Sequence, residues 1–410
     1  MGLKEDALKY HSEKKGKIEI RVKTSAKSQQ DLTLAYTPGV ADVCKEIVAR
    51  KDAVYDYTLK WNSVAVVSDG TRVLGLGDIG PLGSLPVMEG KALLFKAFGG
   101  VDAFPLPLNC KDEDAIVETV KRIEPAFGGI NLEDIESPKC FAVERRLKEA
   151  LEIPVFHDDQ HGTAVVVLAG LINSLKFVGK KKNEVRVVVN GAGAAGSAIA
   201  RLLHSYGFSK MVCMDSKGVI NFARKDLPDY KRELAEMSGK EGEKSGGLAE
   251  VLRGADILVS AAKPNIVTKE MVKSMANKAI LFPLNNPEPE ILPKDALEAG
   301  AVIVGTARSD YPNQVNNVLG FPGIFRGALD VRAKRINEEM KVAASLAIAS
   351  LVSDEEISRG KVMPDAWSKK VGPRVAGAVA EAAVKSGVAR IRKSAKEEEE
   401  YASKIIEKQG

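Results

Sequence analysis

The feature that most constrains the fold is a glycine-rich turn between a β-rich run and a helical segment. Residues 185–190 read VRVVVN, GAGAAG follows at 191–196, and SAIARLL continues as an amphipathic helix. Glycine in the GxGxxG pattern permits a tight turn, the approach of a pyrophosphate to the backbone and close packing of helix on strand. The start of a helix also favours an anion. The segment predicts dinucleotide binding by Gly191, Gly193, Ala194, Ala195 and Gly196; alternatively, its glycines only close a tight turn.

An acidic residue in the next β-rich run supports the first alternative. Asp215 ends MVCMD roughly 20 residues after the glycine turn, where an acid that binds the ribose is expected. Its carboxylate would accept a hydrogen bond from a free 2′-hydroxyl and repel a 2′-phosphate, although Ser216, Lys217 and Arg224 follow and could neutralise one. We therefore favour NAD as the cofactor and leave NADP open.

The order of the apolar runs predicts an α/β fold. After residue 185, the short β-rich runs VRVVVN, MVCMD, ADILVS, AILFPL and AVIVG alternate with helical segments, which is typical of a doubly wound parallel sheet of the Rossmann type. Before residue 155, predicted helical stretches at 41–49, 91–98 and 113–123 alternate with short apolar runs and many glycine and proline turns. The tail is rich in Ala, Lys and Glu and predicts helices, with the EEEE run at 397–400 as a solvated face. We predict an N-terminal substrate-side α/β domain (1–158), a nucleotide domain (159–370) and a helical C-terminal tail (371–410).

Composition excludes several classes of partner. The 410 residues carry 60 Lys and Arg against 55 Asp and Glu, with the two signs well mixed, so we expect no nucleic-acid partner. The N-terminus is polar, and the longest apolar stretch, 164–172, is about half of what a spanning helix needs, so we expect no membrane segment and a cytoplasmic protein. The cysteines stand far apart and predict no disulfide or zinc framework.

Two acidic segments precede the glycine turn. GGINLEDI at 128–135 contains Glu133 and Asp134, and VFHDDQHGT at 155–163 contains Asp159. Oxygen ligands of this kind suit Mg²⁺ or Mn²⁺ and leave places for substrate oxygens. An isolated Glu-Asp pair is also common at a solvated helix start. His157 and His161 could instead bind zinc, but we favour hydrogen-bonded structural histidines, because no cysteine or HExxH pattern accompanies them.

Taken together, the segments resemble malic enzyme in its short prokaryotic form. The matching segments occur in family order between residues 34 and about 330: LAYTPGVA at 34–41, TRVLGLGDIG at 71–80, MEGK at 88–91, FGGINLED at 127–134, FHDDQHGT at 156–163, the glycine turn, Asn286-Pro287 and SDYPNQVNN at 309–317. The resemblance assigns the GLGDIG segment to the substrate side, although it mimics a second dinucleotide motif.

The resemblance implies metal-dependent oxidative decarboxylation of L-malate to pyruvate and CO₂ with reduction of NAD or NADP. It assigns Glu133, Asp134 and Asp159 to the metal, and Lys91 and Tyr36 to general base and acid catalysis. It further implies that Arg72, Asn286 and Asn317 bind malate, with Asn286 also near the cofactor. Lys91 can act as a base only if its pKa is brought down, and we expect burial beside a cation to do so.

Two other functions remain open: a redox-neutral malate decarboxylase of the malolactic type, and a regulatory nucleotide-binding module without catalysis. The family also implies a homo-oligomer, most simply a dimer, in which the segment that carries Tyr36 could complete a neighbour's site. The chain reads FPLNNP at 282–287 and VGTARSD at 304–310, where the family usually reads ALANP and TGRSD. Neither departure touches the assigned metal or acid–base residues.

Overall fold

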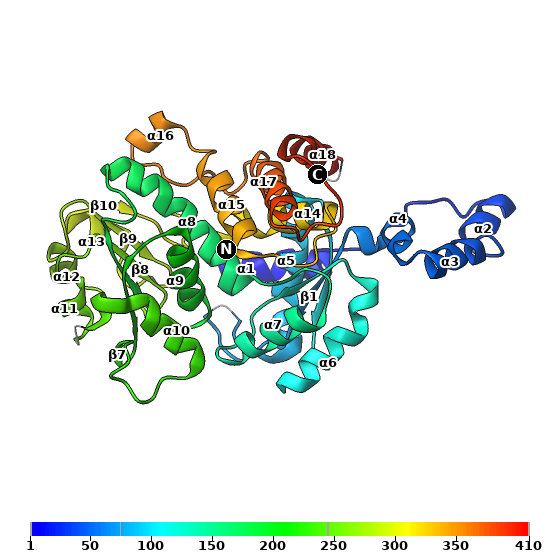
Figure 1. Cartoon of the computed structure of the whole chain (residues 1–410). Coiled ribbons are helices and arrows are strands. Elements are labelled where there is room, and N and C mark those ends of the chain that lie inside the picture. Colours follow the sequence, from blue (N-terminus) through cyan, green and yellow to red (C-terminus); the bar gives the residue numbers. More distant parts are fainter. Residues whose placement is uncertain (1, 74, 244–245, 409–410) are drawn as a thin grey trace.

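The computed structural model describes residues 2–73, 75–243 and 246–408, and its core holds two β-sheets (Figure 1). The first sheet is wholly parallel, in the order β2-β1-β3-β4. The second has the order β10-β9-β8-β5-β6-β7 and is parallel except for the antiparallel strand β7. The predicted α/β class is confirmed, and β7 is the element of the second sheet that we did not predict. The strands are β1 (Ser63–Ser68), β2 (Asp102–Pro107), β3 (Gly129–Leu132), β4 (Val155–His157), β5 (Arg186–Asn190), β6 (Lys210–Asp215), β7 (Gly218–Val219), β8 (Ile257–Ser260), β9 (Ala279–Pro283) and β10 (Ala301–Val304).

The central strands are short apolar runs because both of their faces are covered. In β5, Val187 and Val189 face a large core that extends to Val64 of the first sheet, whereas Val188 faces a second core on the opposite side. In β1, Ala65 and Val67 contact a third core. Alternate residues of one strand thus enter different cores, as the pleat requires. The largest core is shared by both sheets and joins the two halves of the molecule.

Helices cover both sheets and form the two ends of the chain. The five predicted β-rich runs of the second half lie in β5, β6, β8, β9 and β10, and the predicted helical stretches 41–49, 91–98 and 113–123 lie in α3, α5 and α6. The α-helices are α1 (Leu3–Lys14), α2 (Gln29–Ala35), α3 (Val40–Ala49), α4 (Val54–Tyr57), α5 (Gly80–Gly99), α6 (Glu113–Ile123), α7 (Lys139–Ala150), α8 (Asp158–Val178), α9 (Ala194–Tyr206), α10 (Asp229–Ser238), α11 (Leu248–Leu252), α12 (Lys269–Lys273), α13 (Pro293–Glu298), α14 (Phe321–Asp330), α15 (Glu338–Ala349), α16 (Asp354–Ser358), α17 (Val371–Lys385) and α18 (Ala395–Glu407).

Helix α8 connects the two halves. It starts directly after β4 of the first sheet and packs against α9 and α15 of the second half. Among the described residues it is the one helix long and apolar enough to cross a membrane, but 78% of its most apolar window is buried inside the protein. Its apolar character is therefore that of a core helix.

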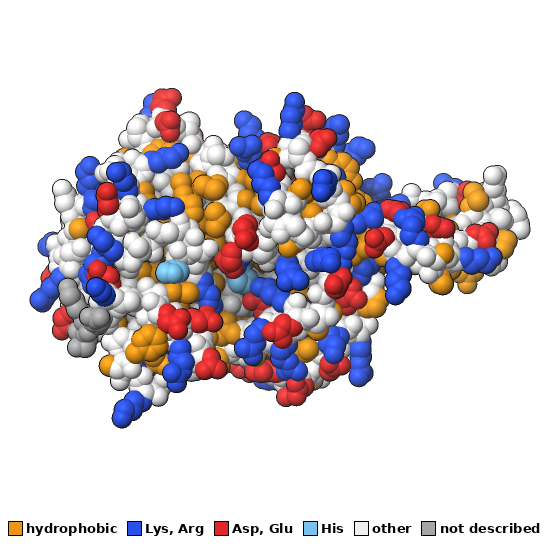
Figure 2. Space-filling model, in the orientation of Figure 1, with side chains coloured by type: hydrophobic (Ala, Val, Ile, Leu, Met, Phe, Trp, Pro, Cys, Tyr) orange, Lys and Arg blue, Asp and Glu red, His pale blue; other side chains and the backbone are white. Residues whose placement is uncertain are grey.

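The N-terminal helices α2, α3 and α4 form an arm that projects from the body (Figure 1). Neither α2 nor α3 has a buried residue, although α3 is amphipathic. Exposed apolar side chains of the arm include Leu32, Leu34, Val40 and Val48. Figure 2 shows hydrophobic side chains on this arm among charged ones. Apolar side chains gathered on a projecting segment are typical of a surface that contacts another molecule.

The C-terminal helices pack back on the body: α17 contacts α14 and α15, and α18 contacts α17. Our expectation that residues 397–400 form a solvated face is wrong for one residue. Glu398 is fully buried, and its carboxylate accepts a hydrogen bond of 2.8 Å from Lys393 Nζ. The physical reason is the helix period, which turns one residue of any run of four toward the core.

Candidate active site

The predicted acidic residues meet at the carboxyl ends of β3 and β4. Glu133 and Asp134 follow β3, and Asp158 and Asp159 form the first turn of α8 directly after β4. Because these two strands are parallel neighbours, their ends lie at the same edge of the first sheet. The negative charges of Asp158 and Asp159 also suit the amino end of a helix, where the helix dipole is positive.

Three carboxylates have the geometry of a cation site. Ligand atoms of Glu133, Asp134 and Asp159 all lie within 4.8 Å of one another. Asp134 adopts a left-handed backbone conformation, with φ of 54°, and its N–H donates to Asp159 Oδ2 at 2.9 Å. Burial and the neighbouring carboxylates raise the pKa of Glu133 well above its usual range, against the opposing effect of Lys91. Such a concentration of negative charge fits a hard divalent cation with oxygen ligands.

Lys91 of α5 lies inside the acidic cluster. Its Nζ is 2.6 Å from Asp158 Oδ2 and 2.9 Å from Glu133 Oε1, and it stands 4.3 Å from the ring centroid of Phe321. Burial lowers the pKa of Lys91, but the two carboxylates outweigh it and hold this pKa above its ordinary value. Direct contact with two anions thus favours the ammonium form of Lys91 in the chain by itself. The expected lowering of its pKa beside a bound cation stays a prediction.

Asn317 reaches the same cluster from the second half of the chain. Its Nδ2 donates to Asp158 Oδ2 at 2.9 Å, and its Oδ1 accepts from Thr163 Oγ1 at 3.2 Å. Asp158 therefore connects Lys91 to Asn317. We did not predict Asp158, although it stands beside Asp159 in the same motif, because an adjacent pair of aspartates does not indicate which carboxylate faces which partner.

Arg72 and Asn286 are exposed and lie on two loops that approach each other. The backbone N–H of Arg72 donates to the carbonyl of Asp134 at 3.0 Å, which ties the Arg72 loop to the acidic cluster. A side-chain carbon at Gly75 would stand 3.1 Å from Pro287 Cδ and 3.4 Å from the carbonyl oxygen of Asn286. The two loops thus border the cluster, although within the described parts of the chain neither the Arg72 nor the Asn286 side chain makes a hydrogen bond to it.

Tyr36 is not brought to this cluster within one chain. It follows α2 on the projecting arm, and 72% of its surface is exposed. Figure 1 shows α2 and α3 reaching away from the two sheets and from α5, the helix that carries Lys91. The predicted acid and the predicted base are therefore separated in this chain.

The glycine turn lies between β5 and α9, as predicted. Gly191 has φ of 106°, which favours glycine, and a side-chain carbon at Gly196 would stand 1.9 Å from the carbonyl oxygen of Gly191. At Gly193, by contrast, nothing lies within 4 Å of such an atom, so the amino end of α9 opens on free space. Two glycines close the turn and the third leaves room above it, which fits a dinucleotide pyrophosphate.

Asp215 ends β6, directly beside the glycine turn, because Gly191 N donates to the carbonyl of Met214 at 2.9 Å. Burial raises the pKa of Asp215, but hydrogen bonds from Arg224 and Lys231 outweigh it and lower this pKa to about 2. Arg224 was among the residues expected near Asp215, whereas Lys231, which comes from α10 and lies 16 residues from Asp215, was not.

A buried glutamate fixes the start of α8. Glu144 of α7 accepts hydrogen bonds from the backbone of His157 at 3.2 Å and from Gln160 Nε2 at 3.3 Å, and His161 Nε2 lies 2.8 Å from its Oε1. Burial lowers the pKa of His161 to about 3, so its ring is neutral. His161 is thus a hydrogen-bonded structural histidine, whereas neither ring nitrogen of the buried His157 has a hydrogen-bond partner among the described residues. No local pattern in the sequence singles out Glu144.

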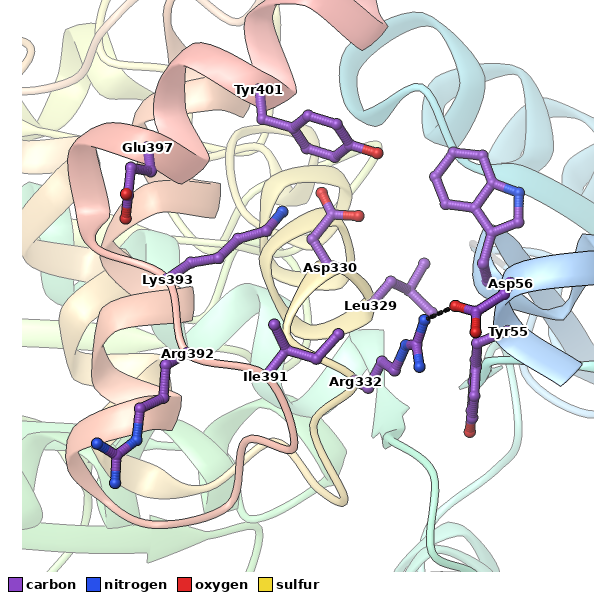
Figure 3. Close-up of a pocket in the computed structure, with 11 residues that line it drawn as sticks. Tyr55, Asp56, Leu329, Asp330, Arg332, Ile391, Arg392, Lys393, Glu397 and Tyr401 are labelled. Atoms are coloured by element: carbon purple, nitrogen blue, oxygen red, sulfur yellow. Dashed lines mark hydrogen bonds and ion pairs between the residues drawn. The ribbon is translucent and has the colours of Figure 1, made fainter. Parts of the chain in front are cut away.

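One cavity lies away from these residues. It measures about 620 Å³ and is bordered by the carboxyl end of α14, by the start of α18 and by residues before β1 (Figure 3). Phe321, the contact of Lys91, is at the opposite end of α14. Figure 3 shows Arg332 of this cavity paired with Asp56. The acidic cluster and the glycine turn, rather than this cavity, have the chemistry of an active site.

Comparisons with known proteins agree with this geometry. Residues 15–148 match the malic enzyme N-terminal domain, and residues 160–384 match the malic enzyme NAD-binding domain. The bifunctional malic/malolactic enzyme of Bacillus subtilis is 56% identical over 99% of both chains. The NAD-dependent malic enzyme of Geobacillus stearothermophilus is 53% identical over 92% of this chain and 78% of its own.

A solved structure has the same fold over nearly the whole chain. The crystal structure of malic enzyme from Pyrococcus horikoshii superposes with a TM-score of 0.94 and 50% identity, covering 99% of this chain and 96% of that one. The two matched domains together span most of the sequence, and the relatives match it almost from end to end. The chain belongs to the malic enzyme family.

Proposed function

We propose that this protein catalyses the oxidative decarboxylation of L-malate to pyruvate and CO₂ with reduction of a nicotinamide dinucleotide. The observation that carries the proposal is the meeting of Lys91 with Glu133 and Asp158 beside the three-carboxylate cluster. A regulatory module without catalysis would have no need to bury a lysine among so many acids.

Glu133, Asp134 and Asp159 are the residues that would hold Mg²⁺ or Mn²⁺. A bound divalent cation supplies positive charge that polarises the hydroxyl of malate and offsets the carboxylate charge that keeps Lys91 protonated. Lys91, placed between Glu133 and Asp158, is the group that takes the hydroxyl proton. Asp158 orients both Lys91 and Asn317, since its Oδ2 accepts a hydrogen bond from each of them.

The remaining residues would bind and orient malate and the dinucleotide. We assign Asn317, Arg72 and Asn286 to the carboxylates of malate, because Asn317 touches the cluster and the other two border it. The open side of Gly193 at the start of α9 would hold the pyrophosphate of a dinucleotide, which would supply the hydride acceptor for C2 of malate. The reaction then needs an acid that delivers a proton to C3.

We assign this acid to Tyr36 of a second copy of the chain. Two observations support the assignment: the arm bearing Tyr36 buries none of the residues of α2 and α3, and it exposes apolar side chains. Helix α5, which carries Lys91, also exposes apolar side chains at Leu82 and Leu93. Exchange of arms within a dimer would cover apolar surface on both copies and bring Tyr36 to a site that lacks it.

The proposed reaction is tested by incubating the protein with L-malate, Mn²⁺ and either NAD or NADP, while following reduced cofactor and pyruvate together. We expect equal amounts of the two products, and none after the metal is chelated. Turnover that continues unchanged in the presence of chelator would contradict the assigned role of the three carboxylates.

A malolactic activity is the second candidate, because the relative from Bacillus subtilis is named a bifunctional malic/malolactic enzyme. The same residues would serve, since decarboxylation and proton transfer are common to both reactions. Lactate formed from malate without net reduction of cofactor would support this candidate, and pyruvate in step with reduced cofactor would support the first.

A further inference from the structure

The carboxylate of Asp215 is fully occupied by donors from the protein. Its Oδ1 accepts from the backbone of Lys217 at 2.9 Å and from Arg224 Nη1 at 2.8 Å. Its Oδ2 accepts from Arg224 Nη2 at 3.1 Å and from Lys231 Nζ at 2.5 Å. A carboxylate offers about four lone-pair positions. A ribose hydroxyl that needed an acceptor here would first have to displace a cation.

Donors, in contrast, are in surplus around Asp215. Lys231 directs a single hydrogen bond at Asp215, and the other hydrogens of its ammonium group have no hydrogen-bond partner among the described residues. Arg224 also pairs with Asp226 at 3.1 Å, and Lys217 Nζ pairs with the same carboxylate at 2.5 Å. The cluster thus combines three cations with two carboxylates and carries a positive excess.

The cluster lies where the adenosine ribose of a dinucleotide is expected. Asp215 ends β6, and β6 pairs in parallel with β5, which leads into the glycine turn. The side chains of Arg224 and Lys231 are only 15% and 18% exposed. Their charges are consequently less screened by salt than those of surface residues.

We propose that Arg224 and Lys231, held in place by Asp215, form a 2′-phosphate site, so that the chain binds NADP more tightly than NAD. A 2′-hydroxyl would donate to an acceptor that is already saturated, whereas a 2′-phosphate only accepts and carries negative charge. This inference rests on the proposed nicotinamide chemistry and refines its cofactor. It reverses the preference for NAD that Asp215 alone suggests in the sequence.

The test measures binding of cofactor fragments to the free protein by calorimetry, using adenosine 2′,5′-bisphosphate and 5′-AMP. We expect the bisphosphate to bind at least about tenfold more tightly than 5′-AMP. Arg224→Ala and Lys231→Ala should each remove most of this difference while leaving 5′-AMP binding nearly unchanged. Arg232→Ala is the matched control, because Arg232 lies next to Lys231 on α10, pairs only loosely with Asp229 at 3.9 Å and should keep the wild-type ratio.

Two further variants sharpen the outcome. Asp215→Asn removes a negative charge beside the same cations and should raise the preference for the bisphosphate, whereas Arg224→Lys should retain part of it. Equal affinity of the wild-type protein for both fragments would overturn the 2′-phosphate site but not the dinucleotide site. Failure of both fragments to bind would overturn both proposals. Thermal unfolding of each variant confirms that a lost preference does not come from a lost fold.

Discussion

At the scale of residues, the acidic cluster places a single lysine among four carboxylates. Asp134, Asp158 and Asp159 all act on the pKa of Glu133, and Lys91 contacts Glu133 and Asp158 directly. A buried charge that loses its partner is costly, so each member depends on the others. Any added positive charge would therefore shift the pKa values of the whole cluster, which is the property that a metal-dependent site needs.

Replacement of Lys91 by alanine tests the base. We expect kcat to fall by about 10²- to 10⁴-fold, the usual contribution of a positioned acid or base, with dinucleotide binding retained. Lys96→Ala is the control on the same helix, because Lys96 is 41% exposed and pairs with Asp102 outside the cluster. Steady-state kinetics and cofactor binding are measured on both variants. Near-normal turnover of the Lys91 variant would eliminate it as the base.

Glu133→Gln tests the cation site without relying on catalysis. We expect the affinity for Mn²⁺, measured by equilibrium dialysis, to fall at least about tenfold because an ionised oxygen ligand is lost. Glu136→Gln is the matched control, since Glu136 stands three residues later with a side chain that is 54% exposed. Equal Mn²⁺ affinity in the two variants would show that Glu133 is not a ligand.

Except for Asp158, the residues of this cluster could be named from the sequence because their motifs are contiguous and ordered. What could not be predicted is the partner of each carboxylate. Asp158 contacts Lys91 of α5, and Asp215 at the end of β6 accepts a hydrogen bond from Lys231 of α10. Such pairings are decided by side-chain directions in the folded chain, and no spacing in the sequence encodes them.

At the scale of elements, the turn between β5 and α9 is closed by two glycines, and the third leaves it open. A methyl group at Gly196 would collide with the backbone oxygen of Gly191, whereas one at Gly193 would meet nothing within 4 Å. The same small substitution should thus have different effects at the two positions.

We expect Gly196→Ala to lower the free energy of unfolding by about 1–3 kcal/mol, as overpacking does. Gly193→Ala should leave stability nearly unchanged but weaken dinucleotide binding, because its methyl group projects into the open space. Urea unfolding and cofactor titration measure the two quantities. A Gly196 variant as stable as the wild type would contradict the close contact.

The buried Glu398 of α18 predicts a dependence of stability on pH. Burial, together with the neighbouring Asp330, raises the pKa of Glu398 to about 9, against about 4.3 in an unfolded chain. The folded state therefore holds the proton more tightly, and this contribution to stability is lost as pH rises through about 9. Glu398→Gln, which mimics the protonated acid, should melt increasingly above the wild type as pH rises from 6 to 9, on the order of a few degrees.

The neighbouring Glu400 supplies the control, because its side chain is 60% exposed. Glu400→Gln should follow the wild-type melting temperature at every pH. Parallel pH profiles for the Glu398 variant and the wild type would mean that Glu398 is ionised in the folded protein.

The strands of the second half could be predicted to within one or two residues, because each is a short apolar run between turns. Two features of the structure could not be predicted from the sequence. Strand β7 has only two residues, too few for any pattern, and the inward position of Glu398 depends on how α18 rotates against α14 and α17. The physical cause in both cases is tertiary packing, which overrides local composition.

At the scale of the whole molecule, the projecting arm separates Tyr36 from Lys91. The sequence places both residues in one site by family resemblance, but it contains no signal for where an arm points. The predicted dimer and the domain limits at 158 and 370 likewise stay predictions.

An intersubunit complementation experiment decides whether Tyr36 acts on a neighbour. Tyr36→Phe and Lys91→Ala chains, each expected to be nearly inactive alone, are co-expressed with different tags in equal amounts. If dimers form at random, mixed dimers contain one intact site and the mixture should recover about a quarter of wild-type activity. Lys96→Ala replaces the Lys91 variant in the control mixture. No recovery in purified mixed dimers would place Tyr36 in its own chain's site.

Helix α8 has a consequence for how such proteins can be recombined. Strand β4 belongs to the first sheet and α8 packs on the second half, yet His157 and Asp158 are consecutive, with no loop between them. A crossover before β4 would take a foreign strand into the first sheet. A crossover after it would join a native strand to a foreign helix that must still present Asp158 to Lys91 and Asp159 to Asp134. A chimera between distant relatives should therefore fail at this junction even where each half folds.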